Sequence, residues 1–590
     1  MGKTAPMHPK FSPLAMARQL KAPFWLGLVL FLGYLSLGSN FFPTHYDWTT
    51  LFTCSTVERT LLIPDQFQRS NGLVISHIFQ TPFYCHVGKC LAFFNYHGRM
   101  LLPLELLNLF FASLALLFFY LTLLKLSMEP ISAFLSSAFL GFGYGFWYWS
   151  GQTYGYNISS FFVFLSLFLY LSFPGIKGIL LAGVSSSLAV GFATLSFPFI
   201  GIMLLLILCK PVAVRTRFIF VFAYILTIFI SFQFFLSFLM DYSFSPDLIY
   251  FSTANLFRTA HDAFLDLNQQ LFRNGLLRTF KWNFLPGLME LSCPEGSIIY
   301  DHSLAAMRLN ETMNRTILGA ILMIIFLGLL YFKRLWALKK AIVLIFLPWI
   351  VFFGFSFMLI DPFNNFVNIT FAGVIFLICA ACTVSKVNRI ILTVALGILF
   401  WGNFHQVLTG HSRDPVMVAS ENIAGIIHQG DYYLMRLDPA DAEWALMYYY
   451  LLEGLPMDEK ETQALFNGCL TDSLADKIKY ILAKDKYVFF NLTRFERNMR
   501  LRGFTVVPGW WKYLGSTFEV STAFVFPYHD SFFKHVLICP VTNQSSTPYS
   551  GIALEDLVNR GAFDNEIIYE TYLAIRSRGE GGKGLKNEQK

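Results

Sequence analysis

The feature that most constrains this chain is a series of long apolar runs in its first 406 residues. A helix needs about 20 mostly apolar residues to cross a bilayer. Only 14% of the 590 residues are charged, whereas soluble proteins carry about 25%. The sequence therefore predicts a mainly α-helical, multi-pass membrane protein. The candidate spans are 23–42, 101–124, 131–148, 157–173, 178–193, 195–209, 218–240, 316–332, 341–360, 366–384 and 389–406.

The charges of the connecting turns decide between ten and eleven spans. The pair 178–193 and 195–209 is short, and Pro198 falls near its bend, so it is either a tight hairpin or one broken helix. Cytoplasmic turns of membrane proteins are enriched in Lys and Arg. If the hairpin crosses twice, every second turn is basic, and we therefore expect eleven spans. These turns hold Lys125; Lys177; Lys210, Arg215 and Arg217; Lys333, Arg334, Lys339 and Lys340; and Lys386 and Arg389.

The same rule predicts the orientation. Lys3, Lys10, Arg18 and Lys21 precede the first span, which favours a cytoplasmic N-terminus and a first span that acts as a signal anchor. The net charge of +7 is then explained by cations on the cytoplasmic side, and we predict no nucleic-acid partner. The expected location is the bacterial inner membrane, or the endoplasmic reticulum in a eukaryote.

This orientation predicts four regions. A C-terminal α/β domain on the outer face is indicated by strand-like runs at Tyr432–Leu437, Tyr487–Asn491 and Phe533–Cys539, with helix-like runs at Asp441–Glu453 and Thr471–Ala483. Within the first outer loop, 72–94 is expected to be an interfacial helix interrupted by Pro82. The regions are a cytoplasmic segment 1–22, a membrane domain 23–406 with outer loops 41–100 and 241–315, the outer domain 407–575 and a disordered tail 576–590.

Asp47 is the candidate catalytic residue, because it follows the first span at the outer boundary. A carboxylate there could take a proton from an acceptor, or orient an acceptor or a metal, while a lipid-linked donor stays in the bilayer. The alternative is a solvated loop residue.

His77 is a candidate for the donor or acceptor pocket, with interfacial packing as its alternative. It is expected on the helix face opposite His86, which argues against a metal site shared by the two histidines.

The turn from Trp147 to Asn157 is the second candidate region. Its rings suit a membrane-interface belt, whereas Gln152, Thr153 and Asn157 are less expected at that depth. Amides and aromatic faces are what a sugar site uses, so Gln152, Tyr154 and Asn157 are candidate substrate-binding residues.

Further outer residues are weaker candidates. Arg258 and Lys281 are cations suited to a phosphate headgroup, and the turn from Asp361 to Asn365 could bind hydroxyls, although such residues are also ordinary turn formers. No metal site is predicted and no cofactor is required, although a divalent cation stays open. The chain has no P-loop or Gly-rich nucleotide loop, which argues against ATP-driven transport.

At these residues the chain resembles the GT-C superfamily of polyprenyl-phosphate-sugar-dependent glycosyltransferases, and within it the branch related to transmembrane O-mannosyltransferases, formerly a domain of unknown function. That branch has an Asp-rich motif in the first outer loop, matched by Asp47, and then a His-Pro-Pro-Gly-Tyr-Pro-like segment, loosely matched from His77 to Tyr84. Its Glu-Val-Tyr-Ala-Leu-Asn-like turn corresponds to residues 152–157. The resemblance covers most of residues 25–455, with degenerate motifs.

Two positions depart from this pattern. The family's second acid in the first loop is Thr50 here, and its Glu in the later turn is Gln152. Glu58 is the candidate substitute for the missing first-loop acid.

The resemblance implies transfer of a sugar from a polyprenyl-phosphate donor to a glycan, lipid or protein acceptor at the outer face. One alternative is a polysaccharide or lipid transporter or a polymerase, in which ionisable residues are expected near span midpoints. The other is a non-catalytic scaffold in envelope assembly, which the loss of family acids favours.

Overall fold

The computed structural model describes ten helices and five strands of the chain. The chain divides into two compact units: residues 1–44, 56–292 and 304–412 form the first, and residues 45–55, 293–303 and 413–590 form the second. Each unit is described by itself. The described residues are 13–40, 50, 53–54, 56–58, 61, 78–96, 100–126, 129–193, 196–240, 386–410, 432–434, 488–491, 519–528, 531–539 and 552–553.

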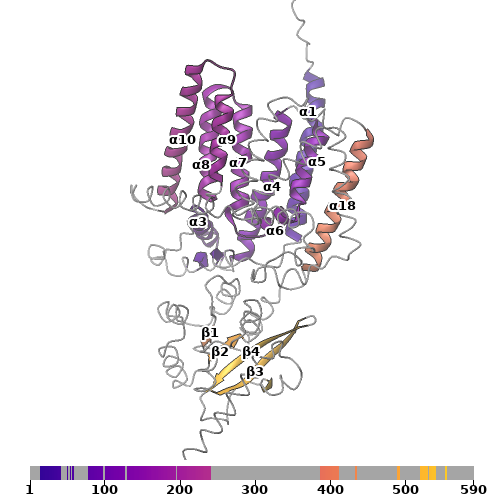
Figure 1. The fold of residues 1–590 in the computed structure, drawn as a ribbon, viewed down its shortest axis with the longest axis vertical. Helices are drawn as coiled ribbons and strands as arrows, with labels where there is room; N and C mark the ends of the chain where they lie inside the picture. The colour runs from indigo at the N-terminus through magenta and orange to yellow at the C-terminus, as the bar shows by residue number, and fades with distance from the viewer. Residues whose placement is uncertain are drawn as a thin grey trace, which may run out of the picture. The chain divides into compact units, whose positions relative to one another are not determined.

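The first unit is a helical bundle (Figure 1). Its described helices are α1 (Pro13–Asn40), α3 (Gln80–Phe93), α4 (Leu101–Lys125), α5 (Pro130–Gly141), α6 (Tyr144–Ser150), α7 (Gly155–Ser172), α8 (Gly175–Phe192), α9 (Phe197–Leu208), α10 (Val214–Met240) and α18 (Lys386–Gly410).

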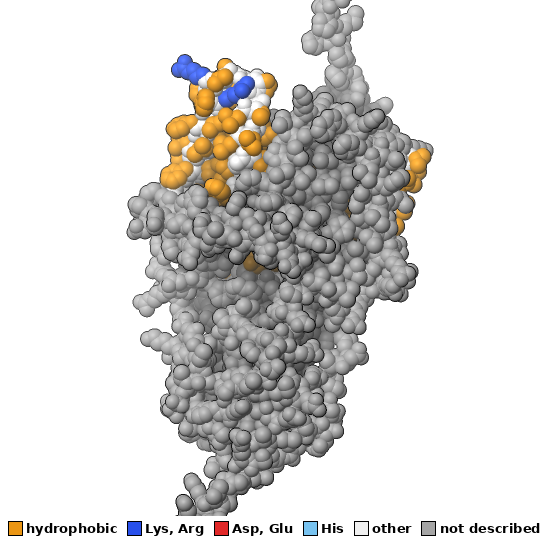
Figure 2. All heavy atoms as spheres, viewed as in Figure 1, with side chains coloured by type: hydrophobic (Ala, Val, Ile, Leu, Met, Phe, Trp, Pro, Cys, Tyr) orange, Lys and Arg blue, Asp and Glu red, His pale blue; other side chains and the backbone are white. Residues whose placement is uncertain are grey.

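Four described helices, α4, α7, α8 and α10, are long and apolar enough to cross a membrane. Shorter apolar helices include α5 and stretches of α1, α9 and α18. On α10 the exposed face is covered with hydrophobic side chains such as Phe218 and Phe222, and Lys and Arg gather at one end (Figure 2). This is the surface of an integral membrane protein, because apolar side chains of this size face lipid at little cost. The predicted spans 316–332, 341–360 and 366–384 lie outside the described residues.

Serine hydroxyls and glycines join the central helices. Ser166 on α7 bonds Ser186 on α8, with 2.9 Å between their Oγ atoms, and Ser186 bonds the Tyr224 hydroxyl on α10 at 2.8 Å. Gly183 on α8 faces Thr227 on α10, and a methyl group at this glycine would meet the Thr227 side chain at 3.0 Å. Small residues and side-chain hydrogen bonds hold helices together where lipid removes the hydrophobic drive.

The predicted span 131–148 is wrong as one continuous helix. The helix ends at Gly141, and a separate helix, α6, begins at Tyr144. Glycine lowers helix stability, and Gly141 and Gly143 bracket the break. Packing of Trp147, whose ring stacks on Phe400 of α18 at 6.1 Å between centroids, favours the reoriented second segment.

The segment 178–209 forms the two helices of a hairpin, α8 and α9, rather than one broken helix. The hydroxyl of Tyr170, near the end of α7, donates to the carbonyl oxygen of Leu206, near the end of α9, at 3.0 Å. The Lys210 ammonium then lies 5.2 Å from the ring centre of Tyr170. Since α8 begins where α7 ends, Lys177 and Lys210 lie at the same end of the bundle.

We call this end the basic end. It carries Lys125, Lys177, Lys210, Arg215, Arg217 and Arg389, the last paired with Glu129 at 2.7 Å. Among the described side chains, one further Lys or Arg, Lys89, lies elsewhere. The opposite end holds α3, α6 and the start of α4, and we call it the α3 end (Figure 1).

The second unit contains a five-stranded sheet with the order β1-β2-β4-β3-β5. Its strands are β1 (Tyr432–Leu434), β2 (Val488–Asn491), β3 (Glu519–Tyr528), β4 (Ser531–Cys539) and β5 (Ile552–Ala553). Strands β1 and β2 are parallel, whereas the other neighbouring pairs are antiparallel. The three predicted strands correspond to β1, β2 and β4. The longest strand, β3, was not predicted, and the two predicted helices lie outside the described residues.

Candidate functional site

The candidate site is built on the clamp between α3 and the turn that connects α6 to α7. The amide of Phe79 donates to the carbonyl oxygen of Gly191, at the end of α8, at 2.9 Å. The next side chain, Gln80, is buried; its Nε2 donates to the Thr153 carbonyl oxygen at 2.9 Å, and its Oε1 accepts from the Gly155 amide at 2.9 Å. Both hydrogen-bonding groups of the carboxamide therefore hold the backbone on either side of Tyr154.

The prediction that Pro82 interrupts this helix is wrong. Pro82 lies in the first turn of α3, where backbone amides have no acceptor within the helix. Proline therefore costs no hydrogen bond at this position, and the helix continues to Phe93. His86 lies in the middle of α3, with Nδ1 2.8 Å from the Pro82 carbonyl oxygen and its ring stacked on Phe238 of α10. It packs α3 against the bundle.

The turn is held from a second side by α4. The carboxamide Nδ2 of Asn108 donates to the carbonyl oxygen of Trp149 at 2.9 Å and to that of Gln152. Asn108, Gln152 and Thr153 are completely buried. The turn is therefore fixed by two amide side chains from helices distant in the sequence.

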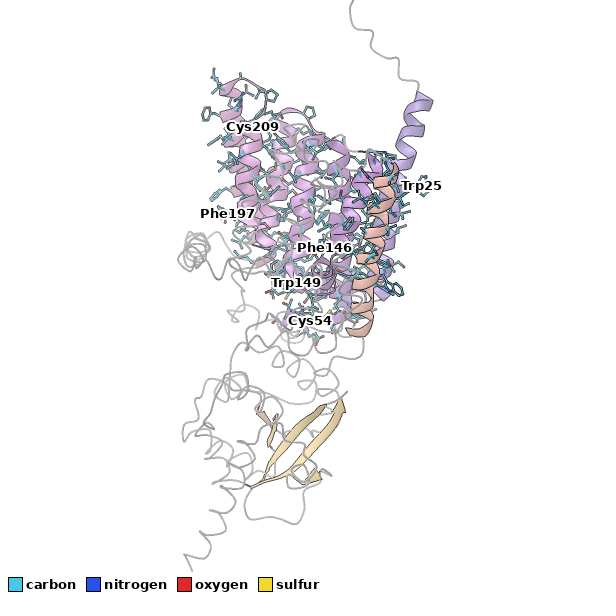
Figure 3. All side chains as sticks on the ribbon, turned by 45° about the vertical axis from the view of Figure 1, so that its right-hand side comes forward. Trp25, Cys54, Phe146, Trp149, Phe197 and Cys209 are labelled. Carbon is cyan, nitrogen blue, oxygen red and sulfur yellow. The ribbon has the colours of Figure 1, made fainter. Side chains whose placement is uncertain are left out.

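Three rings form one aromatic cluster on this turn. Tyr154 and Tyr156 stack with 4.5 Å between their centroids, and Trp149 meets them edge-on at 5.0 and 5.3 Å. Of the three, Tyr154 retains the most exposed surface. Trp149 lies toward the α3 end of the unit, whereas Cys209 lies at the basic end (Figure 3). Flat apolar rings beside buried amides can bind a ligand that has both apolar faces and hydroxyl groups.

The structure brings three of the predicted residues together in this turn. Gln152 and Asn157 are buried, with Asn157 in the first turn of α7, and Tyr154 is partly exposed between them. Tyr154 is thus the partly exposed residue of the turn, while Gln152 and Asn157 are buried. Binding of a substrate by these residues stays a prediction.

The side chain of Glu58 contacts the N-terminus of α4. Its Oε1 accepts a hydrogen bond from the Met100 amide at 2.8 Å, and Met100 is the N-cap of that helix. A carboxylate is favourable there, because the amide groups at a helix N-terminus carry partial positive charge. One oxygen of Glu58 is thereby used to begin α4, and its proposed part in a site is not tested by this contact.

Gln80, Glu105 and Asn108 were not predicted. The signal for the last two was a carboxylate and an amide, one helical turn apart, inside the apolar run 101–124. Such residues within a span are expensive and are commonly functional. Gln80 had no comparable signal, since its role depends on a turn 73 residues later.

Asp47, His77, Arg258, Lys281 and the turn 361–365 lie outside the described residues, so their roles stay predictions. Within the described part of the chain, no group of three or more His, Cys, Asp or Glu side chains is placed to hold a metal ion.

No protein-family model matches the chain, and no curated protein matches it. Solved structures with weak similarity include the oligosaccharyltransferase AglB from Archaeoglobus fulgidus, in complex with an inhibitory peptide and a dolichol-phosphate, at 10% identity over 90% of this chain and 75% of that chain, with a TM-score of 0.44. Another is ArnT from Cupriavidus metallidurans bound to undecaprenyl phosphate, at 10% identity over 90% of this chain and 99% of that chain, with a TM-score of 0.45. The apo state of the same ArnT has a TM-score of 0.34 at 11% identity.

Proposed function

We propose that this protein is a membrane glycosyltransferase that moves a sugar from a polyprenyl-phosphate donor to a glycan, lipid or protein acceptor at the outer face of the membrane. The observation that carries the proposal is the clamped turn at the α3 end, in which Gln80 and Asn108 hold the aromatic cluster of Trp149, Tyr154 and Tyr156. A sugar ring presents apolar C–H faces to aromatic rings and hydroxyls to amides and carboxylates. A rigid support favours such binding, because fewer groups lose freedom when the ligand arrives.

The distribution of charge supports the outer location. Six of the described cations gather at the basic end, which the positive-inside rule assigns to the cytoplasm. The clamped turn is at the other end of the bundle, and a donor whose lipid lies in the outer leaflet would reach it there.

The positions of ionisable residues favour an enzyme over a transporter. In the described helices that could cross the membrane, Asp, Glu, Lys and Arg occur close to the helix ends, as Glu105 and Lys125 do on α4. A transporter of polar substrates is expected to place such groups near the middle of the bilayer.

In the proposed reaction Asp47 is the base or the acceptor-orienting carboxylate. His77 and Arg258 would contact the donor or acceptor, Glu58 would substitute for the missing first-loop acid, and Gln152, Tyr154 and Asn157 would line the site. These roles come from the sequence pattern and the family resemblance.

The test is transfer of labelled sugar by the purified protein in lipid nanodiscs. Undecaprenyl phosphates carrying mannose, glucose, galactose or arabinose are offered with membrane extracts as acceptors. We expect transfer from at least one donor, and loss of about 100-fold or more in rate for Asp47→Asn, since a positioned base contributes about 10²–10⁴-fold.

Two results would contradict this proposal differently. Unchanged turnover by Asp47→Asn overturns the role of Asp47 alone. No transfer from any donor by a well-folded wild type, together with stable capture of envelope proteins, would favour the scaffold.

A further inference from the structure

Three cations gather where α9 ends and α10 begins. Lys210 lies in the turn between the two helices, and Arg215 and Arg217 lie at the start of α10. Within the described part of the chain, none of the three forms an ion pair, whereas Arg389, a cation of α18 at the same basic end, is paired with Glu129 at 2.7 Å. The α9–α10 turn therefore carries a positive charge that no described carboxylate neutralises.

Lys210 and Arg217 are both held in place by contacts within this turn. The Val212 amide donates to the Lys210 carbonyl oxygen at 2.8 Å, and the Val212 carbonyl oxygen accepts from Arg217 Nε at 3.0 Å. The Lys210 ammonium lies 5.2 Å from the ring centre of Tyr170 and 5.4 Å from that of Phe220. Phe220 follows Arg217 by three positions on α10, so the two side chains lie on one face of the helix. The turn therefore fixes two positive groups near each other, and an anion between them would relieve their repulsion.

The cations border an apolar surface that faces away from the bundle. On α10, Phe218 and Phe222 follow Arg215 by three and seven positions, on the same face of the helix, and they are 63% and 67% exposed. On α9, Leu205 and Leu208 are also exposed. Apolar side chains cover this part of the bundle, with Lys and Arg at its end (Figure 2). A ligand that covers both features needs an anionic group joined to a hydrocarbon chain.

We propose that the α9–α10 turn binds an anionic phospholipid, with the phosphate between Lys210 and Arg217 and an acyl chain along Phe218 and Phe222. A guanidinium matches two phosphate oxygens, and an ammonium adds a point charge. Basic sites between membrane helices bind lipid headgroups in this way. Phospholipid is in large excess over a sugar-lipid donor in a membrane, so the phospholipid fills the site by mass action.

The retention of cations at one side of the membrane explains only part of this arrangement. It accounts for Lys and Arg at the basic end. It does not require that Lys210 lie against two rings or that Arg217 donate to a backbone carbonyl, since a cation that only sets the orientation can extend into water. The inference is independent of the proposed function, because the clamped turn lies at the other end of the bundle.

The experiment compares two photoreactive lipids that differ only in the headgroup. Phosphatidylglycerol and phosphatidylcholine with the same diazirine-bearing acyl chain are added separately to the full-length protein in phosphatidylcholine nanodiscs, and the adducts are mapped by mass spectrometry. A Lys or Arg beside an anionic lipid contributes roughly fivefold in affinity. We therefore expect phosphatidylglycerol to label residues 205–222 at least about fivefold more than phosphatidylcholine does. Equal labelling by the two lipids overturns the inference.

A pair of double variants separates this turn from the net charge of the protein. Lys210→Gln with Arg217→Gln should remove most of the preference for phosphatidylglycerol and leave labelling by phosphatidylcholine unchanged. The matched control is Lys89→Gln with Arg389→Gln, which removes as many charges from the α3 end and from the ion pair with Glu129, and it should keep the preference. Equal loss in both double variants would mean that net charge selects the lipid, and the inference is overturned.

Two measurements on wild type decide the matter if the Lys210 and Arg217 variant does not fold. High salt should reduce the preference, because salt screens exposed charges, and a preference that salt leaves unchanged overturns the inference. Glycerol phosphate, a soluble headgroup without acyl chains, should not displace the photoreactive lipid. If it competes as well as unlabelled phosphatidylglycerol does, the turn binds phosphate alone and the assignment to a phospholipid is overturned.

Discussion

Gln80 donates from Nε2 to the carbonyl oxygen of Thr153 at 2.9 Å, across 73 residues of sequence, while its Oε1 accepts from Gly155. This one side chain joins the start of α3 to the turn that presents Tyr154. The geometry of the turn therefore depends on the position at which α3 begins. His77, a candidate site residue, precedes Gln80 by three positions in the sequence. A change at Gln80 should affect the turn before it affects the bundle.

Gln80→Ala is expected to lower the free energy of unfolding by about 2–6 kcal/mol, because a buried carbonyl and a buried amide each lose a partner at a cost of about 1–3 kcal/mol. Chemical unfolding in detergent measures this. The control is Gln233→Ala on α10, a partly exposed glutamine, for which we expect a change below about 0.5 kcal/mol. Equal effects of the two substitutions would show that the hydrogen bonds of Gln80 add nothing to the free energy of unfolding.

Gly155 and Gly191 should not tolerate a methyl group. A Cβ atom at Gly155 would lie 2.2 Å from the Phe192 carbonyl oxygen, and one at Gly191 would lie 2.0 Å from the ring of Phe79. Overpacking costs about 1–3 kcal/mol or more, so each Gly→Ala change should lower thermal stability. Gly201→Ala is the control, since no atom lies within 4 Å of its added methyl group. A stable, active Gly155→Ala protein would contradict the close approach of α7 to the end of α8.

Glu58 should stabilise α4 through charge as well as through its hydrogen bond. Glu58→Gln keeps an acceptor for the Met100 amide and should cost about 0.3–1 kcal/mol from the lost interaction with the helix N-terminus. Glu58→Ala removes the acceptor too and should cost about 0.5–2 kcal/mol. Unfolding of both variants in low and high salt measures the difference. A Glu58→Gln protein as stable as wild type at low salt would refute the charge contribution.

The Ser186–Tyr224 hydrogen bond should show measurable coupling between α8 and α10. Tyr224→Phe and Ser186→Ala remove opposite ends of the 2.8 Å contact. Hydrogen bonds between membrane helices average about 0.6 kcal/mol, with a maximum near 1.7. A double-mutant cycle should return a coupling in this range. Strict additivity of the two changes would mean that the hydroxyl pair does not stabilise the bundle.

Apolar length and turn charge predicted much of the helical unit. The basic turns at Lys177 and Lys210 correctly predicted that residues 178–209 form a hairpin. A single crossing would have placed these two cations at opposite ends of the bundle. Periodicity gave no warning of the break at Gly143, since all the residues around it are apolar. The break between α5 and α6 is explained by tertiary packing of Trp147 against α18.

The candidate site was predictable only where the chemistry is local. The turn 152–157 was recognisable from its own amides and rings, whereas the clamp of Gln80 and Asn108 depends on contacts between segments that the sequence keeps apart. Glu105 could have been found as the one acid in its apolar run. Pro82 misled the prediction because a proline within a helical pattern is also compatible with the first turn.

The central claim is that the sugar donor binds at the α3 end of the bundle. Its most direct test is photocrosslinking of an undecaprenyl-phosphate sugar, with the photoreactive group on the sugar, to wild-type protein in nanodiscs, followed by mapping of the adducts. We predict adducts at Tyr154 and at the start of α4, competed by unlabelled donor. Competed adducts at Lys177 or Lys210 of the basic end, or none that the donor competes, would contradict the claim.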